Sequence, residues 1–211
     1  MLLPLLTVVA VSLDPTTYSG RDGQILVAPP RLDGAVEIDG VLNESQWAQS
    51  ARLTGFSQYT PSDGRPAQDS TEVLVWYSAT AIHFGIRAFE RHGVVSATLA
   101  ERDRITAGDY LELLLGTFND GRQAMVFAVS PLGVQADGIL VETGATAGGF
   151  TGATVARERP DLSPDFVFAS AGRITDYGYE VEVRIPFKSL RYQPAAEQTW
   201  GLNVVRYLFR W

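Results

Sequence analysis

Arginines supply almost all of the positive charge in this chain. Lys188 is its only lysine, although lysine and arginine together number 17. A guanidinium offers forked donors that fit carboxylates or sugar hydroxyls. Arg102 and Arg104 stand in the charge run ERDR, so they either line the rim of a binding face or belong to a solvated loop with weak ion pairs. Arg122 and Arg206 allow the same two interpretations.

Aromatic side chains are the second group that could contact a ligand. Trp76 and Tyr77 are neighbours in a predicted strand, so their side chains point to opposite faces. We expect one of them in the core and the other at the surface, where an exposed ring could serve as a binding platform. Trp200 precedes a glycine at the start of another predicted strand, which suits either packing or a ligand contact.

Patterns for catalysis and metal binding are weak. A glycosidase needs two carboxylates that face each other across a cleft, and no Asp or Glu pair here is marked by its spacing, so we predict no catalytic residue. With two histidines and no cysteine, the chain has no zinc-site spacing and no disulfide. The loops contain Asp, Asn and Gly without an EF-hand pattern, so calcium stays open but no ligand set is identified.

A haem site is a further alternative. Some sandwich proteins hold haem through a methionine and a basic residue, and this chain offers Met125, Lys188, His83 and His92. A haem also needs a broad apolar pocket with ligands on both of its faces. Met125 lies in an apolar run where methionine usually fills a core, so a haem-binding electron-transfer sandwich is the last alternative.

Composition limits the class of protein. A chain of 211 residues, 45% hydrophobic and 19% charged, fits one domain with a core. Its net charge of -7 opposes nucleic-acid binding, because an acidic chain repels phosphate backbones. Residues 1–13 resemble a short secretory signal or form a buried first strand, and they are too short to span a membrane. We expect a linker at 14–30 and the folded domain at 31–211.

A hydrophobic period of two dominates the domain. The run from Gly178 to Ile185 alternates apolar and charged side chains, and its charged face is expected to be wet. A hairpin turn is expected at Asn119-Asp120-Gly121. Other strands are expected at 35–38, 72–77, 81–89, 110–115, 123–129, 134–141 and 200–209. Such short strands favour an all-β, antiparallel, jelly-roll-like sandwich with one or two short helices.

The segment IDGVLNESQWAQSA predicts one of those helices. Asn43 is expected to cap it, with Gln46 as the capping-box partner. Trp47 and Ala51 then lie one turn apart on its inner side. We expect the helix to seal one end of the sandwich, with Trp47 as a structural plug rather than a ligand contact.

Six segments in one order resemble family 9 carbohydrate-binding modules and the similar domains at the N-termini of larger secreted bacterial proteins. They are IDGVLNESQWAQSA, TEVLVWYSATAIHFGIRAFE, DYLELLLGTFNDGR, FAVSPLGVQADG, GYEVEVRIPFKSLRY and WGLNVVRYLFR. The resemblance extends from about Arg31 to Trp211. Its last two segments look most like the longer proteins, in which a large second domain follows. It implies a β-sandwich that binds sugar chains without cutting them.

The resemblance also implies a site. In sugar-binding members, two aromatic rings pinch a terminal sugar while Arg, Asn and acidic side chains bond its hydroxyls. By position, the acidic motif falls on Asp109 to Glu112, and Glu112 becomes a hydroxyl acceptor. An aromatic is expected a few residues earlier, but residues 104–108 (RITAG) hold none, so one wall of the pinch is missing. Trp200 could be the other wall.

By this resemblance, the chain is a non-catalytic polysaccharide-binding or oligosaccharide-binding module that serves an attached or partner glycoside hydrolase. It is expected to be secreted or periplasmic, with no transmembrane helix, and with a C-terminal domain or envelope partner beside it. The alternative is a structural N-terminal module of a larger cell-envelope protein without a sugar ligand. The expected sugar face comprises Arg102, Arg104, Asp109, Glu112, Trp76, Tyr77 and Trp200.

Overall fold

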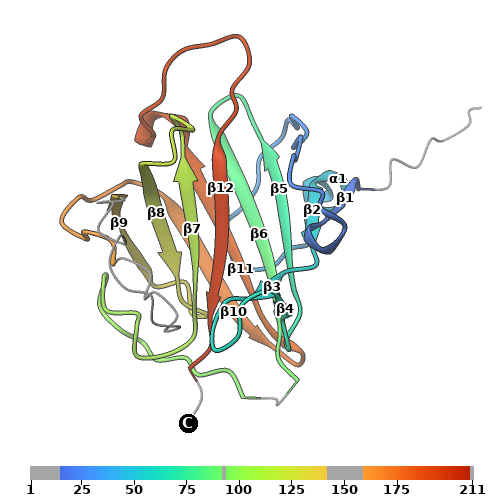
Figure 1. The fold of residues 1–211 in the computed structure, drawn as a ribbon, viewed down its shortest axis with the longest axis vertical. Helices are drawn as coiled ribbons and strands as arrows, with labels where there is room; N and C mark the ends of the chain where they lie inside the picture. The colour runs from blue at the N-terminus through green and yellow to red at the C-terminus, as the bar shows by residue number, and fades with distance from the viewer. Residues whose placement is uncertain (1–14, 92–93, 142–158, 210–211) are drawn as a thin grey trace, which may run out of the picture.

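A computed structural model describes residues 15–91, 94–141 and 159–209, in which two β-sheets pack face to face (Figure 1). The six-stranded sheet has the spatial order β1 (Thr17–Ser19), β2 (Ala51–Thr54), β5 (Thr71–Tyr77), β6 (Ala81–Phe89), β11 (Gly178–Pro186) and β10 (Ala169–Thr175). The four-stranded sheet has the order β12 (Gly201–Tyr207), β7 (Tyr110–Gly116), β8 (Gln123–Val129) and β9 (Gln135–Val141). The remaining elements are the small pair β3 (Ser57–Gln58) and β4 (Arg65–Pro66), the helix α1 (Ser45–Gln49), and the 3-10 turns η1 (Gly20–Asp22) and η2 (Phe187–Ser189).

The expected all-β sandwich is confirmed. Strands β6 and β8 have the boundaries that the alternation predicts, and the turn after β11 is η2. Asn119 and Gly121 close the β7–β8 hairpin with φ angles of 50° and 67°, the left-handed backbone that these residue types tolerate. Strand β1, which pairs in parallel with β2, lies in the stretch 14–30 that was expected to be a linker.

The main core lies between the two sheets. Alternate residues point inward because successive side chains of a strand face opposite ways. Strand β11 contributes Tyr179, Val181, Val183 and Ile185, and β7 contributes Leu111, Leu113 and Leu115. Each of these side chains is at most 2% exposed. Met125 belongs to the same cluster, where it fills space between the sheets.

The outer face of the six-stranded sheet is covered over β11, where Glu180 and Glu182 are 6% and 0% exposed, so the expectation of a wet face on that strand is wrong. Leu42 and Trp47 pack on Leu74 and Trp76 to form a second apolar cluster. Gly85 of β6 makes this approach feasible, since a Cβ there would lie 2.9 Å from the Trp47 ring. The structural role of Trp47 is confirmed by its 2% exposure, but α1 covers a sheet face rather than an end of the sandwich.

Glu182 holds residues 39–49, which we call the covering segment, on the sheet. Its carboxylate has no exposed surface, and it accepts hydrogen bonds from the N–H groups of Asp39 (2.9 Å) and Gly40 (2.8 Å) and from Trp47 Nε1 (3.1 Å). Burial raises the pKa of Glu182 to about 7 against the effect of these donors. The nearby charge of Glu44, which shares the indole N–H of Trp47 at 3.0 Å, adds to the rise.

Some local expectations fail near this segment. Glu44, not Asn43, is the N-cap residue of α1, and no side chain caps the helix. Gln46 instead donates its amide to the carbonyl of Asp33 at 3.1 Å. Residues 35–38 form no strand. Backbone partners outside the helix therefore decide how this short segment is held.

Arg206 joins the two sheets rather than lining a binding rim. It faces inward from β12, opposite Leu111 of β7. Its Nη1 donates to the carbonyls of Ser70 (3.2 Å) and Phe89 (2.9 Å), which belong to the six-stranded sheet or precede it. Its Nη2 lies 3.7 Å from a carboxylate oxygen of Glu90. A buried cation is held here by carbonyl and carboxylate oxygens.

The titration of Glu182 predicts a pH-dependent contribution to folding. Because its folded pKa lies above the ordinary value of 4.5, this contribution is fully present below about pH 4.5 and is lost as the pH rises through 7. Relative to the wild type, Glu182→Gln should therefore gain up to about 3 kcal/mol of unfolding free energy across that window. Urea unfolding at a series of pH values measures the difference.

The comparison with the variant is needed because His83 titrates in the opposite sense. Burial and the charge of Arg184 lower the pKa of His83 to about 4. The contribution of His83 to folding stability is therefore present above pH 6.5 and lost as the pH falls through 4. Both proteins keep His83, so it cancels in the difference. A difference that stays constant across the window would show that Glu182 does not titrate there.

Candidate functional site

Arg102 and Arg104 have different environments. Arg102 donates to Gln135 Oε1 at 2.7 Å and forms an ion pair with the fully buried carboxylate of Asp137. It also donates to the carbonyl of Phe166 at 3.1 Å, so it ties β9 to a following loop. Arg104 is 77% exposed and lies 3.6 Å from Glu101. Arg102 is thus engaged in structure, and Arg104 belongs to a solvated loop.

Asp109 also holds the structure together. It is 3% exposed and accepts hydrogen bonds from the N–H groups of Phe209 (2.7 Å) and Ser96 (3.3 Å). Burial raises its pKa, while these backbone donors oppose the rise. The carboxylate therefore connects the loop before β7 to the chain after β12.

Trp76 and Tyr77 point to opposite faces of β5, as expected. Trp76 has no exposed surface, stacks on His83 with ring centroids 3.8 Å apart, and faces the covering segment. Tyr77 is half-buried and packs against the main core. Trp76 therefore cannot serve as a binding platform, and it lies on the outer face of the six-stranded sheet.

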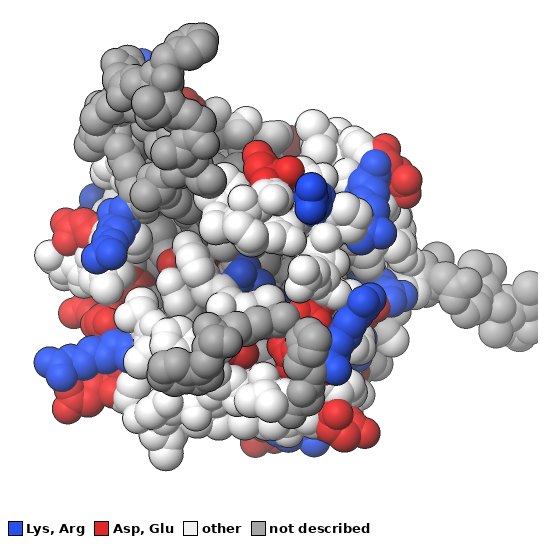
Figure 2. Space-filling model, turned by 60° about the horizontal axis from the view of Figure 1, so that its bottom comes forward, with Lys and Arg blue, Asp and Glu red and all other residues white. Residues whose placement is uncertain are grey.

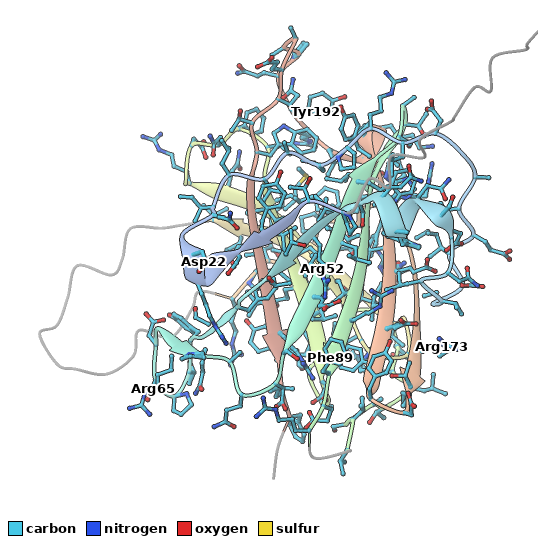
Figure 3. The ribbon with its side chains drawn as sticks, turned by 90° about the vertical axis from the view of Figure 1, so that its right-hand side faces the viewer. Asp22, Arg52, Arg65, Phe89, Arg173 and Tyr192 are labelled. Atoms are coloured by element: carbon cyan, nitrogen blue, oxygen red, sulfur yellow. The ribbon has the colours of Figure 1, made fainter. Side chains whose placement is uncertain are left out.

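Trp200 belongs to an aromatic cluster at the upper end of the molecule. Its ring packs edge-on against Phe187 at 6.1 Å and lies 5.5 Å from Tyr192. Figure 3 shows Tyr192 at the opposite end of the molecule from Phe89. Strand β12 runs from this upper end down to Tyr207, six residue steps or about 20 Å away. Trp200 is thus remote from that strand's lower end.

Glu112 lies on the outer face of the four-stranded sheet, beside a pair of tyrosines. Tyr110 of β7 and Tyr207 of β12 pair directly across the strands, and their rings stack with centroids 4.3 Å apart and an interplanar angle of 11°. The hydroxyl of Tyr207 donates to Glu112 Oε2 at 3.2 Å. Both rings are half-buried, and Glu112 is 8% exposed.

The charges around this tyrosine pair are mixed. Burial, followed by the negative charge of Glu112, raises the pKa of Tyr110, so its hydroxyl stays protonated and can donate. The positive charge of Arg159, an exposed residue, opposes that rise. Asn203 is exposed and shares the outward side of β12 with Tyr207, because the two are four residues apart.

A site can therefore be defined by five residues, which we call the tyrosine site: Tyr110, Glu112, Arg159, Asn203 and Tyr207. It combines aromatic surface, a carboxylate acceptor, a guanidinium donor and an amide, which suit hydroxyl-rich ligands with an apolar ring face. Among the seven expected residues, only Glu112 belongs to it. Arg104 stands near its edge, since Ile105 packs on Ala128 and Ala136 of the same face.

The sequence alone does not indicate the roles of Tyr110 and Tyr207, because these roles arise from strand pairing. Tyr207 lies in the segment WGLNVVRYLFR and Tyr110 in the acidic motif, but neither was singled out. Their contact depends on the register of β12 against β7, which places them directly opposite. Asparagine and arginine were expected ligand types for the family, so Asn203 could have been considered from its segment.

The described part of the chain contains no group of side chains arranged to bind a metal ion or a haem. No group of three or more His, Asp or Glu side chains there could hold a metal ion. Met125 lies between the sheets, whereas His83 faces the other side of the six-stranded sheet, so these two do not converge. His92 falls outside the described residues. No helix among the described residues is long and apolar enough to cross a membrane.

The surface charge is mixed rather than gathered. Figure 2 shows the lower face of the molecule, where basic and acidic side chains alternate around a hollow. A nucleic-acid site would require a continuous basic patch. This face offers none in its described residues, in accord with the net charge of -7.

The environments of the two arginines predict different effects on stability. Arg102→Ala should lower the unfolding free energy by about 1–3 kcal/mol, because it leaves the buried Asp137 without its charged donor. Arg104→Ala should change it by less than about 0.5 kcal/mol, as is usual for an exposed side chain. Urea denaturation measures both, and equal effects would refute the distinction.

Comparisons with known proteins bear on the fold. No family model matches the sequence, and no curated protein matches it. Among solved structures, a family 9 carbohydrate-binding module from Caldicellulosiruptor kristjanssonii in complex with cellotriose is similar, with a TM-score of 0.52 and 14% identity over 90% of this chain and 74% of that one. A family 9 module from the same organism in complex with glucose has a TM-score of 0.51 and 15% identity, over 83% and 75%. This chain has the fold of family 9 carbohydrate-binding modules.

Proposed function

We propose that this protein binds a carbohydrate at the tyrosine site without catalysing a reaction on it. The observation that carries the proposal is the stacked pair Tyr110–Tyr207 with Glu112 hydrogen-bonded beside it. The fold supports it, since two modules of the same fold are described in complex with cellotriose and glucose. The apolar face of a sugar ring can stack on aromatic surface while its hydroxyls bond to polar side chains.

The geometry defines how a sugar would be held. The tyrosine rings lie 4.3 Å apart, which leaves no space for a sugar ring between them. The sugar therefore stacks against the pair from outside rather than being pinched. Its hydroxyls take the place of the Tyr207 hydroxyl as donors to Glu112 and accept from Arg159 and Asn203. Arginine and carboxylate groups form the stronger, charge-assisted bonds of this set.

We also propose a wider role for this module. The module would hold a glycan for an attached or partner glycoside hydrolase in a secreted or periplasmic protein. The apolar stretch at 1–13, with its small-residue pattern, supports export.

A structural module without a sugar ligand is the second candidate. The closed stacking of Tyr110 on Tyr207 favours it, as does the packing of Ile105 over Ala128 and Ala136 of the same sheet face. In that case the two tyrosines and Glu112 serve only to join β7 to β12. The two candidates differ in whether Glu112 affects ligand binding or only stability.

Removal of the carboxylate tests the proposal. Glu112→Ala should weaken cellotriose binding about ten- to hundredfold, because a charged acceptor contributes about 1.5–3 kcal/mol. Tyr207→Phe should retain binding, since it keeps the ring and removes only the hydroxyl that competes for Glu112. Isothermal titration calorimetry with cellotriose, glucose and xylan fragments measures the affinities.

A matched control is Glu101→Ala, which removes an 81% exposed carboxylate from the neighbouring charge run. It should leave the affinity unchanged. Circular dichroism confirms that each variant is folded. If the folded wild type binds none of these sugars, the structural module is the better account.

A further inference from the structure

A cleft of about 380 Å³ opens between α1 and the outer face of the six-stranded sheet. Leu42, Trp47 and Leu74 give it an apolar lining, and Ala48 stands at its α1 side. This volume is within the range of small-molecule sites, which runs from about 300 to 1,000 Å³. The cleft lies on the opposite sheet from the tyrosine site and shares no residue with it.

Arg52, Glu72 and Arg87 form one wall of the cleft, and they belong to a longer row of charged side chains of alternating sign. Glu72 pairs with Arg52, and it lies 3.7 Å from Arg87. Arg87 in turn lies 3.3 Å from Glu180, which is 3.0 Å from Arg173. Figure 3 shows the ends of this row, Arg52 and Arg173, well separated across the sheet. Each guanidinium is fixed by its carboxylate neighbours and so presents its remaining donors in a set direction.

Arg52 provides a donor that the fold leaves unused. Its Nη2 is bonded to Glu72, but its Nε is buried and has no hydrogen-bond partner. Buried donors in native proteins almost always have an acceptor, so an unmatched one needs an explanation. Nε itself has no accessible surface, so the donors that a ligand in the cleft can reach are those of the rest of the Arg52 guanidinium, whose side chain is 39% exposed.

The charges around the cleft select the class of ligand. Arg52 and Arg87 are balanced there by Glu44 and Glu72. An anionic ligand would approach the two carboxylates, and a cationic one would approach the two guanidinium groups, so neither gains from the local field. A neutral ligand with many hydroxyls can accept from the arginines, donate to the carboxylates and cover the apolar lining.

We propose that this cleft is a second binding site, for a neutral sugar, on the face opposite the tyrosine site. A module with two such sites on opposite faces can hold two glycan chains, or two parts of one chain, at the same time. Simultaneous binding raises the overall affinity without new contacts when the geometry permits it. The proposal extends the proposed function to a second site, but it rests on its own residues.

The test is a titration of the isotope-labelled full chain with cellotriose, monitored at each step by two-dimensional nuclear magnetic resonance. The reporters for the cleft are the indole N–H of Trp47 and the backbone amides of Asn43 and Arg52. The reporter for the tyrosine site is the backbone amide of Tyr207. Glucuronic acid, compared with glucose, tests the preference for a neutral ligand.

A filling substitution provides the sharpest variant. Ala48→Trp places a ring in the cleft from an exposed helix position and breaks no hydrogen bond of its own side chain. It should weaken the cellotriose response of the cleft reporters at least about tenfold, or about 1.4 kcal/mol. The control is Gln49→Trp, which introduces the same ring at the next exposed position, does not line the cleft, and gives up only the exposed hydrogen bond from Gln49 to the carbonyl of Ser45.

The outcomes separate the two sites. Saturable shifts at the cleft reporters that vanish in Ala48→Trp, persist in Gln49→Trp and are weaker with glucuronic acid support the cleft. Shifts at Tyr207 with none in the cleft overturn the second site and leave the proposed function standing. Shifts in the cleft with none at Tyr207 overturn the tyrosine site alone, and no shifts at all overturn both.

Discussion

Glu182 lies in the middle of β11 without any exposed surface, so its carboxylate must find its partners inside the protein. It finds them in two backbone N–H groups and the indole of Trp47, all from one segment far earlier in the chain. These three bonds hold that segment on the outer face of the six-stranded sheet, where Trp47 covers Trp76. If the charged carboxylate of Glu182 lost these donors, its charge would be buried without a partner, and the fold would be destabilised.

This arrangement decides where a ligand can bind. The other sheet covers the inner face of the six-stranded sheet, and the segment around α1 covers part of its outer face, so Trp76 is removed from the surface. The covering segment ends beside a cleft whose wall is the ion-pair row from Arg52. The four-stranded sheet keeps its aromatic surface on the other side of the molecule, at Tyr110 and Tyr207. The two candidate sites are thus consequences of which sheet face the segment occupies.

The sequence predicts the strands well because alternation is a local property. Strands β6 and β8 and the burial of Trp47 follow from neighbouring residues alone. The burial of Glu182 could not be predicted, since a charged residue in an alternating strand is usually solvated and its cover comes from a distant segment. The same holds for the site: Glu112 was expected by resemblance, but the stacking of Tyr110 on Tyr207 depends on the register of two distant strands.

The central claim is that the outer face of the four-stranded sheet binds a sugar. The most direct measurement is a crystal structure of the full chain grown with cellotriose. The account predicts a sugar ring stacked on the Tyr110–Tyr207 pair with a hydroxyl within hydrogen-bond distance of Glu112. A cellotriose bound away from this pair, for example at the Trp200 cluster, or an empty tyrosine site in the presence of saturating sugar, would contradict it.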